Sequence, residues 1–109
     1  MSRHDEDRLD DIVDAVAAIR AHLARGSLDD GLVFDAVRIR LVEIGESVKA
    51  LPSDLLESEP GIDWRAIARS RDQLTHHYWD TAGAVVQHVV DHQLDELLLA
   101  VSRLKDKAS

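Results

Sequence analysis

Apolar residues recur every three or four positions along almost the whole chain of 109 residues. In the first segment Leu9, Ile12, Val16 and Ile19 follow this spacing, which places their side chains on one face of an amphipathic helix. No segment shows the strict alternation of apolar and polar residues that is typical of a half-buried strand. The pattern therefore predicts an all-α fold.

Capping residues and helix breakers divide the chain into four predicted helices. We expect them over about residues 5–25, from Asp29 or Asp30 to about Ala50, from Trp64 to a point between Thr75 and Trp79, and from between Thr81 and Ala84 through Leu104. Pro52 ends the second helix, and residues 53–56 could add one short helical turn. Four helices with short connections predict an antiparallel four-helix bundle, formed by a single domain over residues 1–109.

The second predicted helix has apolar residues on more than one face, among them Val33, Val37, Leu41 and Val42. Such a helix is either central in a bundle or packed against a second chain. Gly45 lies inside it and costs about 1 kcal/mol relative to alanine. We therefore expect close packing at Gly45.

Composition excludes several classes of protein. The chain has no cysteine, which excludes disulfide scaffolds and thiolate zinc sites and suits a reducing compartment. No apolar run approaches the roughly 20 residues of a membrane span, and the N-terminus lacks the apolar region of a signal peptide. We expect a soluble, cytoplasmic protein with no membrane partner.

Charge and aromatic content argue against a general nucleic-acid binder. The formal net charge is −8, and only four residues are aromatic, whereas single-strand binders offer a basic groove and several stacking rings. Positive charge is concentrated in residues 64–79, where Arg65, Arg69 and Arg71 face Asp72 as the one acidic residue. If the chain handles RNA, we expect it to do so at a small local site.

The densest group of reactive side chains lies between Arg71 and Trp79. Arginine offers paired donors to a phosphate, and histidine gives or takes a proton near neutral pH. Together they suffice to cleave RNA without a metal, because the ribose 2′-OH supplies the nucleophile. On one straight helix, however, Arg71 and His76 would lie about 140° apart. Either the helix breaks near Thr75, or two copies of the chain compose the site.

The sequence resembles the HEPN domains, specifically the HepT-like ribonuclease toxins. Their signature is R-x-x-x-x-H-x-Y with a polar residue after the arginine, and Arg71, Asp72, His76 and Tyr78 match its four positions. Residues 43–46, ahead of the Leu51-Pro52 break, and residues 62–64 also follow the family pattern. The resemblance covers essentially the whole chain.

This resemblance implies a homodimeric, metal-independent endoribonuclease without a cofactor, with its active cleft between two protomers. Arg71 would stabilise the scissile phosphate, His76 would transfer protons, and Asp72 would orient one or both of them. The products would carry a 2′,3′-cyclic phosphate and a 5′-hydroxyl. A minimal nucleotidyltransferase antitoxin would silence the nuclease by adding AMP to Tyr78, whose added phosphate would repel RNA.

Several alternatives stay open at this stage. His77 could share or replace the role of His76. A different class of function is a non-catalytic nucleotide-binding or dimerisation partner of a nucleotidyltransferase.

The remaining polar residues have less specific interpretations. Glu43 and Glu46 could line the cleft, but a solvated face, or one salt-bridged with Arg40 and Lys49, is the simpler expectation. His88 and His92 share one helix face and could hold zinc or nickel, but no third ligand is evident, so a polar helix face is the simpler interpretation.

Overall fold

The structure, a computed structural model, describes residues 2–76 and 79–108. It contains six helices within this part of the chain. They are α1 (Arg3–Leu23), α2 (Gly31–Lys49), α3 (Ser53–Glu57), α4 (Trp64–Thr75), α5 (Trp79–His92) and α6 (Leu94–Ala108). The predicted all-α class is confirmed, and α3 is the short extra turn expected after Pro52.

Polar caps explain where the long helices begin. Ser2 and Asp5 form a reciprocal capping box at the start of α1. The Asp30 carboxylate accepts from the backbone N–H of Leu32, 2.9 Å away, at the start of α2. Asp63 accepts from the backbone N–H of Ala66 at the start of α4. These side chains satisfy amide groups that the first turn of a helix leaves without partners.

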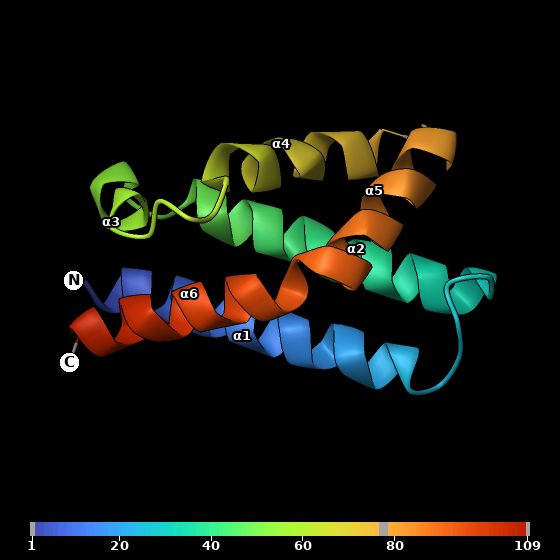
Figure 1. The fold of residues 1–109 in the computed structure, drawn as a ribbon, viewed down its shortest axis with the longest axis horizontal. Helices are drawn as coiled ribbons and strands as arrows, with labels where there is room; N and C mark the ends of the chain where they lie inside the picture. Colours follow the sequence, from blue (N-terminus) through green and yellow to red (C-terminus); the bar gives the residue numbers. More distant parts are fainter. Residues whose placement is uncertain (1, 77–78, 109) are drawn as a thin grey trace.

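The long helices run antiparallel in chain order, and both chain ends lie at the same end of the molecule (Figure 1). Helix α2 is central because it packs against α1, α4 and α5. The core contains the predicted face of α1, together with the inner faces of α2 and α6. Its fully covered side chains include Leu9, Ile12, Ile19, Val37, Ile44, Val101 and Leu104.

The prediction of one continuous fourth helix is wrong. The structure divides it into α5 and α6, with Gln93 between them. Helix α6 packs along α1, whereas α5 packs against α4 and α2, and the two helices point in clearly different directions (Figure 1). A straight helix cannot cover both surfaces, so the chain bends at Gln93.

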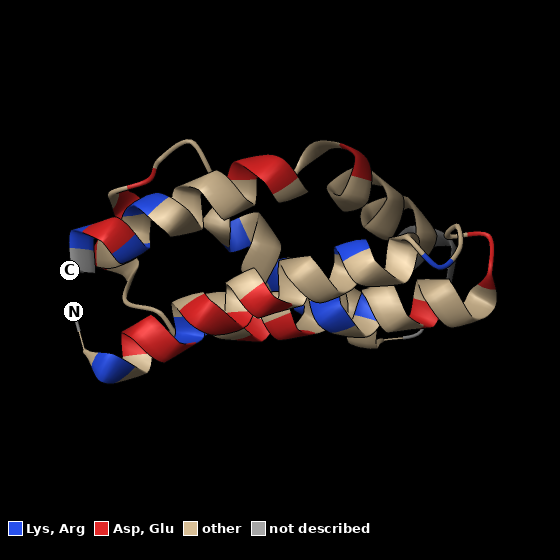
Figure 2. Cartoon of the chain, turned by 90° about the horizontal axis from the view of Figure 1, so that it is seen from below, with Lys and Arg blue, Asp and Glu red and all other residues tan. Residues whose placement is uncertain are grey.

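Charge is distributed unevenly over the fold. Acidic residues follow the first half of the helix that begins at the N-terminus (Figure 2). Helix α1 carries six acidic residues and three arginines, so it holds part of the formal net charge of −8. None of the helices in the described part of the chain has a stretch long and apolar enough to cross a bilayer.

Candidate active site

Helix α4 carries the motif arginine and crosses α2 at Gly45. A Cβ atom built on Gly45 would lie 2.7 Å from the Arg71 Cβ and 3.2 Å from the Ile67 carbonyl oxygen. Real Cβ atoms do not approach a neighbour this closely, so only glycine permits the contact. The close packing expected at Gly45 is confirmed, and its partner is Arg71, the first residue of the R-x-x-x-x-H-x-Y signature.

Arg71 is held by two carboxylates from different elements. Its Nη1 donates to Asp72 Oδ1 at 3.0 Å. Its Nε and Nη2 lie 3.4 and 3.3 Å from Glu46 Oε1 on α2. The hydrogen bonds with Asp72 and Glu46 raise the pKa of Arg71 above its ordinary value. The guanidinium is therefore a permanent cation whose orientation is set by both helices.

Asp72 acts on the same segment in two ways. Its side chain orients Arg71, and this hydrogen bond, together with the charge of Lys49, lowers the pKa of the Asp72 carboxyl. Its backbone carbonyl accepts from the His76 N–H at 3.2 Å and from the Thr75 hydroxyl at 3.1 Å. The resemblance implies that Asp72 would orient Arg71, His76 or both, and the structure shows its contacts with the Arg71 guanidinium and the His76 N–H.

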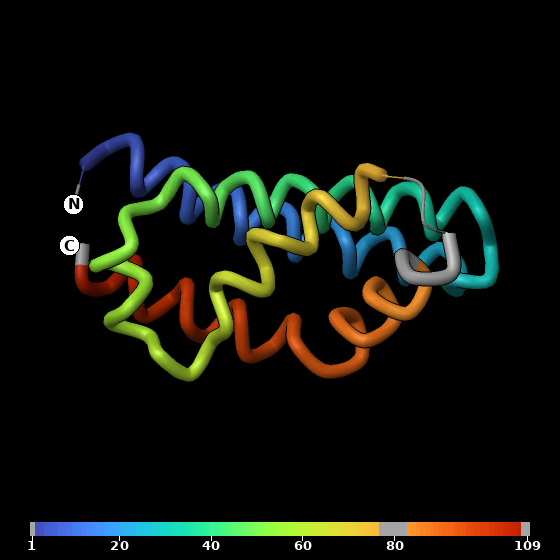
Figure 3. The backbone as a smooth tube through the Cα atoms, turned by 90° about the horizontal axis from the view of Figure 1, so that it is seen from above, coloured from blue at the N-terminus to red at the C-terminus, as the bar shows by residue number. Residues whose placement is uncertain are grey.

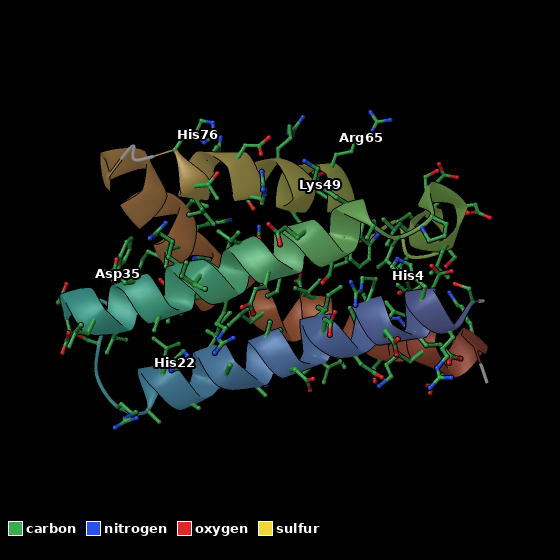
Figure 4. All side chains as sticks on the ribbon, turned by 180° about the vertical axis from the view of Figure 1, so that it is seen from behind. His4, His22, Asp35, Lys49, Arg65 and His76 are labelled. Atoms are coloured by element: carbon green, nitrogen blue, oxygen red, sulfur yellow. The ribbon has the colours of Figure 1, made fainter. Side chains whose placement is uncertain are left out.

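His76 lies just beyond the end of α4. The helix ends at Thr75, and His76 leaves the helical conformation with φ −104° and ψ 69°. Its ring Nδ1 lies 3.2 Å from the Thr75 hydroxyl, and the residue is exposed at this end of the molecule (Figure 4). The predicted break near Thr75 is thus confirmed.

Arg38 is a contact residue that the sequence analysis missed. Its Nη1 donates to the Leu74 carbonyl oxygen at 2.7 Å and so joins α2 to the last turn of α4. A signal existed, because Arg38 precedes Gly45 by seven residues and therefore lies on the same face of the second helix. Nothing in the sequence showed that this face meets the motif.

The two glutamates of α2 have different partners. Glu43 pairs with Arg40, with both carboxylate oxygens 3.1 Å from Nη1, as the simpler expectation held. Glu46 instead contacts Arg71, and Lys49 acts on Asp72 by its charge. Glu46 therefore takes part in contacts across the interface between α2 and α4 and not in a salt-bridged face of α2 alone.

Four predicted residues remain to be placed. His88 and His92 do share one face of α5, with ring centroids 5.2 Å apart and planes tilted by 50°. Within the described residues, no three His, Cys, Asp or Glu side chains are grouped so that they could hold a metal ion. His77 and Tyr78 lie outside the described residues.

A cavity of about 530 Å³ lies on another side of α4. Helix α4 contributes Ala66, Ser70 and Gln73 to its wall, and α5 contributes Val85 and His88. Seen from above, α4 runs obliquely to α2 and diverges from α6 (Figure 3). Neither Arg71 nor His76 lines this cavity, so the motif residues form a separate, open surface.

Comparison with known proteins identifies the family. The family described as "Ribonuclease HepT-like" matches residues 9–104. A protein of Thermococcus cleftensis named "Probable ribonuclease HepT" is 33% identical over 101 residues, which cover 89% of this chain and 92% of that protein. "Putative RNase MJ0127" of Methanocaldococcus jannaschii is 38% identical over 63 residues, covering 58% of this chain and 52% of that protein. No solved structure matches the chain.

The structure is an all-α bundle in which Arg71 lies on α4 and His76 directly follows the end of that helix. The chain belongs to the HepT-like ribonuclease family.

Proposed function

We propose that this chain is a metal-independent endoribonuclease, the toxin of a toxin-antitoxin pair. The observation that carries the proposal is the placement of Arg71 and His76 around the end of α4 in a member of a ribonuclease family. Arg71 is oriented by Asp72 and Glu46, and His76 is exposed. One fixed cation and one group able to transfer protons thus occupy a surface that RNA can reach.

The residues suggest a transesterification that needs no external nucleophile. His76 would accept the proton of a ribose 2′-OH, whose oxygen attacks the adjacent phosphorus. The bond from phosphorus to the 5′-oxygen breaks, and that oxygen takes a proton from an imidazolium or from water. The products are a 2′,3′-cyclic phosphate and a 5′-hydroxyl. Arg71 would stabilise the charge that develops on the non-bridging phosphate oxygens.

A homodimer would bring two such sets of residues to one cleft. Two large apolar side chains on α2 support this proposal, because Leu32 is 84% exposed and Ile39 is 48% exposed. They lie on the helix that also carries Glu46. A second copy packed there would cover these side chains and add a second cluster of arginines, which would offset the overall negative charge near the RNA.

Regulation would act on Tyr78, the fourth residue of the family motif. A minimal nucleotidyltransferase antitoxin would transfer AMP from ATP to the phenol oxygen and release pyrophosphate. The added phosphate would bring negative charge and bulk to a position two residues from His76, where an RNA phosphate must bind. The modified toxin would therefore not cleave RNA.

The test is cleavage of several RNA classes in the presence of EDTA. We expect wild-type protein to produce fragments with cyclic phosphate ends. We expect Arg71→Ala and His76→Ala to lose cleavage by at least about a hundredfold while circular dichroism and oligomeric state stay unchanged. Arg25→Ala removes one arginine distant in sequence and is the control. Retained cleavage in both motif variants would place the active site elsewhere.

Mass spectrometry tests the regulatory part separately. Co-expression with the nucleotidyltransferase should add the mass of one AMP to wild-type protein but not to Tyr78→Phe. If unmodified protein cleaves no RNA, that result would favour a non-catalytic partner of the nucleotidyltransferase.

A further inference from the structure

Arg38 connects α2 to the end of α4. Its Nη1 donates to the Leu74 carbonyl oxygen at 2.7 Å, and its side chain is 21% exposed. Its Nε is buried and has no hydrogen-bond partner among the described residues, with Asp35 Oδ1 4.0 Å away. An arginine held in this way faces the protein, so it is a poor candidate for a phosphate ligand.

The contact between Arg38 and Leu74 lies in the last turn of α4, where backbone carbonyl groups need hydrogen-bond donors. The last carbonyl groups of a helix have no intrahelical partner and carry partial negative charge. In a continuous helix the Leu74 carbonyl would accept from the amide four residues later. Arg38 supplies a charged donor to this carbonyl, and α4 ends at Thr75. The hydrogen bond therefore stabilises the end of the helix directly before His76.

Two contacts on one face of α2 define the position of the motif. Arg38 and Gly45 are seven residues apart, which places them within about 20° of each other around the helix. Gly45 meets the Arg71 Cβ, and Arg38 meets Leu74. The α4 segment between these contacts therefore has a defined register against α2, and His76 follows it immediately.

We propose that Arg38 is a positioning residue for the ribonuclease site. By capping α4 at Leu74, it holds the turn that carries His76 relative to Arg71. The expected effect on cleavage rests on the proposed ribonuclease function. The expected effect of Arg38 on the turn that carries His76 does not depend on that function.

The kinetic test compares Arg38→Met and Arg38→Lys with Arg40→Met. Methionine keeps an apolar stem of similar length but cannot donate, and lysine restores a charged donor. Arg40 is a matched control, because it lies on the same helix and pairs with Glu43. For Arg38→Met we expect kcat to fall by about tenfold or more, since small displacements of reacting groups cost that much. KM should stay within about twofold of wild type, because RNA-binding groups are retained.

Lysine should recover part of the lost kcat, and Arg40→Met should behave as wild type. Wild-type kcat in Arg38→Met would overturn the proposal, as would equal losses in Arg38→Met and Arg40→Met.

A second measurement does not depend on cleavage. The His76 N–H donates to the Asp72 carbonyl, so its hydrogen exchange reports whether the turn after α4 is formed. We expect faster exchange of this amide in Arg38→Met and not in Arg40→Met, with core amides of α1 unchanged in both.

The two measurements separate the two proposals. If wild-type protein cleaves no RNA but His76 exchange is faster in Arg38→Met alone, the proposed function fails and the positioning role stands. Unchanged exchange in Arg38→Met overturns the role of Arg38 whatever the cleavage result.

Discussion

Gly45 of α2 lies directly against Arg71 of α4, so closely that a Cβ at position 45 would be 2.7 Å from the Arg71 Cβ. Gly45, which has no reactive group, is therefore in direct contact with the motif arginine. The position of the guanidinium depends on the distance between α2 and α4. That distance is short because Gly45 has no side chain.

We expect Gly45→Ala to reduce both stability and cleavage. Overpacking costs about 1–3 kcal/mol, and the better helix propensity of alanine returns about 1 kcal/mol, so a net loss of about 1 kcal/mol should appear in urea unfolding. Gly83→Ala in α5 is the control, because nothing lies within 4 Å of a Cβ there. It should gain about 0.5–1 kcal/mol. A Gly45→Ala protein as stable and active as wild type would contradict the close contact.

The pKa of Asp72 should depend on Arg71. The hydrogen bond from Arg71 is the largest cause that lowers the pKa of this carboxyl. Asp72 should therefore remain ionised throughout the neutral range. In Arg71→Ala its pKa should rise towards the ordinary value, as measured by carboxyl carbon NMR during an acid titration. Arg65→Ala removes another α4 arginine and should leave the Asp72 pKa in place. An unchanged value in Arg71→Ala would show that the pair does not form in solution.

Removing the charge of Glu46 should strengthen RNA binding. Glu46 Oε1 lies 3.3 Å from Arg71 Nη2, at the long end for a charge-assisted hydrogen bond, and it competes with an RNA phosphate for the same guanidinium. We expect Glu46→Gln to lower the Kd for an uncleavable 2′-deoxy oligonucleotide about two- to fivefold at low salt, measured by fluorescence anisotropy. Glu43→Gln, on the same helix, should change the Kd less. Equal effects of the two variants would indicate only a general charge effect.

Glu59 should make the stability of the fold dependent on pH. Its carboxylate accepts from Arg103 at 2.6 Å and from Lys107 at 3.0 Å. The hydrogen bonds from Lys107 and Arg103 lower the pKa of Glu59. A lowered folded-state pKa means that the stabilisation is present above the unfolded value, about 4.3, and is lost as the pH falls through the folded value.

We therefore expect Glu59→Gln to lower Tm at pH 7 by a measurable amount, and the difference from wild type to be smaller at pH 3 than at pH 7. Glu57→Gln, at the exposed end of α3, is the control and should leave Tm nearly unchanged at both pH values. A constant difference between wild type and Glu59→Gln across this range would exclude ionisation of Glu59 as its cause.

Helix positions and several local features could be predicted from sequence because their causes are local. A hydrogen bond between residues four apart, a cap such as Asp30 or Asp63, and an apolar face are all present within a short segment. The same applies to Asp72, which adjoins Arg71, and to the break near Thr75, which was one of two predicted solutions. The close packing at Gly45 could also be predicted, since a glycine inside a helix implies a close neighbour.

The contacts that complete the site depended on the tertiary structure. Glu46 and Arg71 are 25 residues apart, and Arg38 and Leu74 are 36 apart, so no local rule pairs them. The bend at Gln93 belongs to the same class, because it follows from the different surfaces that α5 and α6 cover. Sequence alone determined the first three predicted helices and the chemistry that one of them carries. Packing of α4 across α2 decided which side chains orient that chemistry, because helix periodicity defines faces but not the neighbours that meet them.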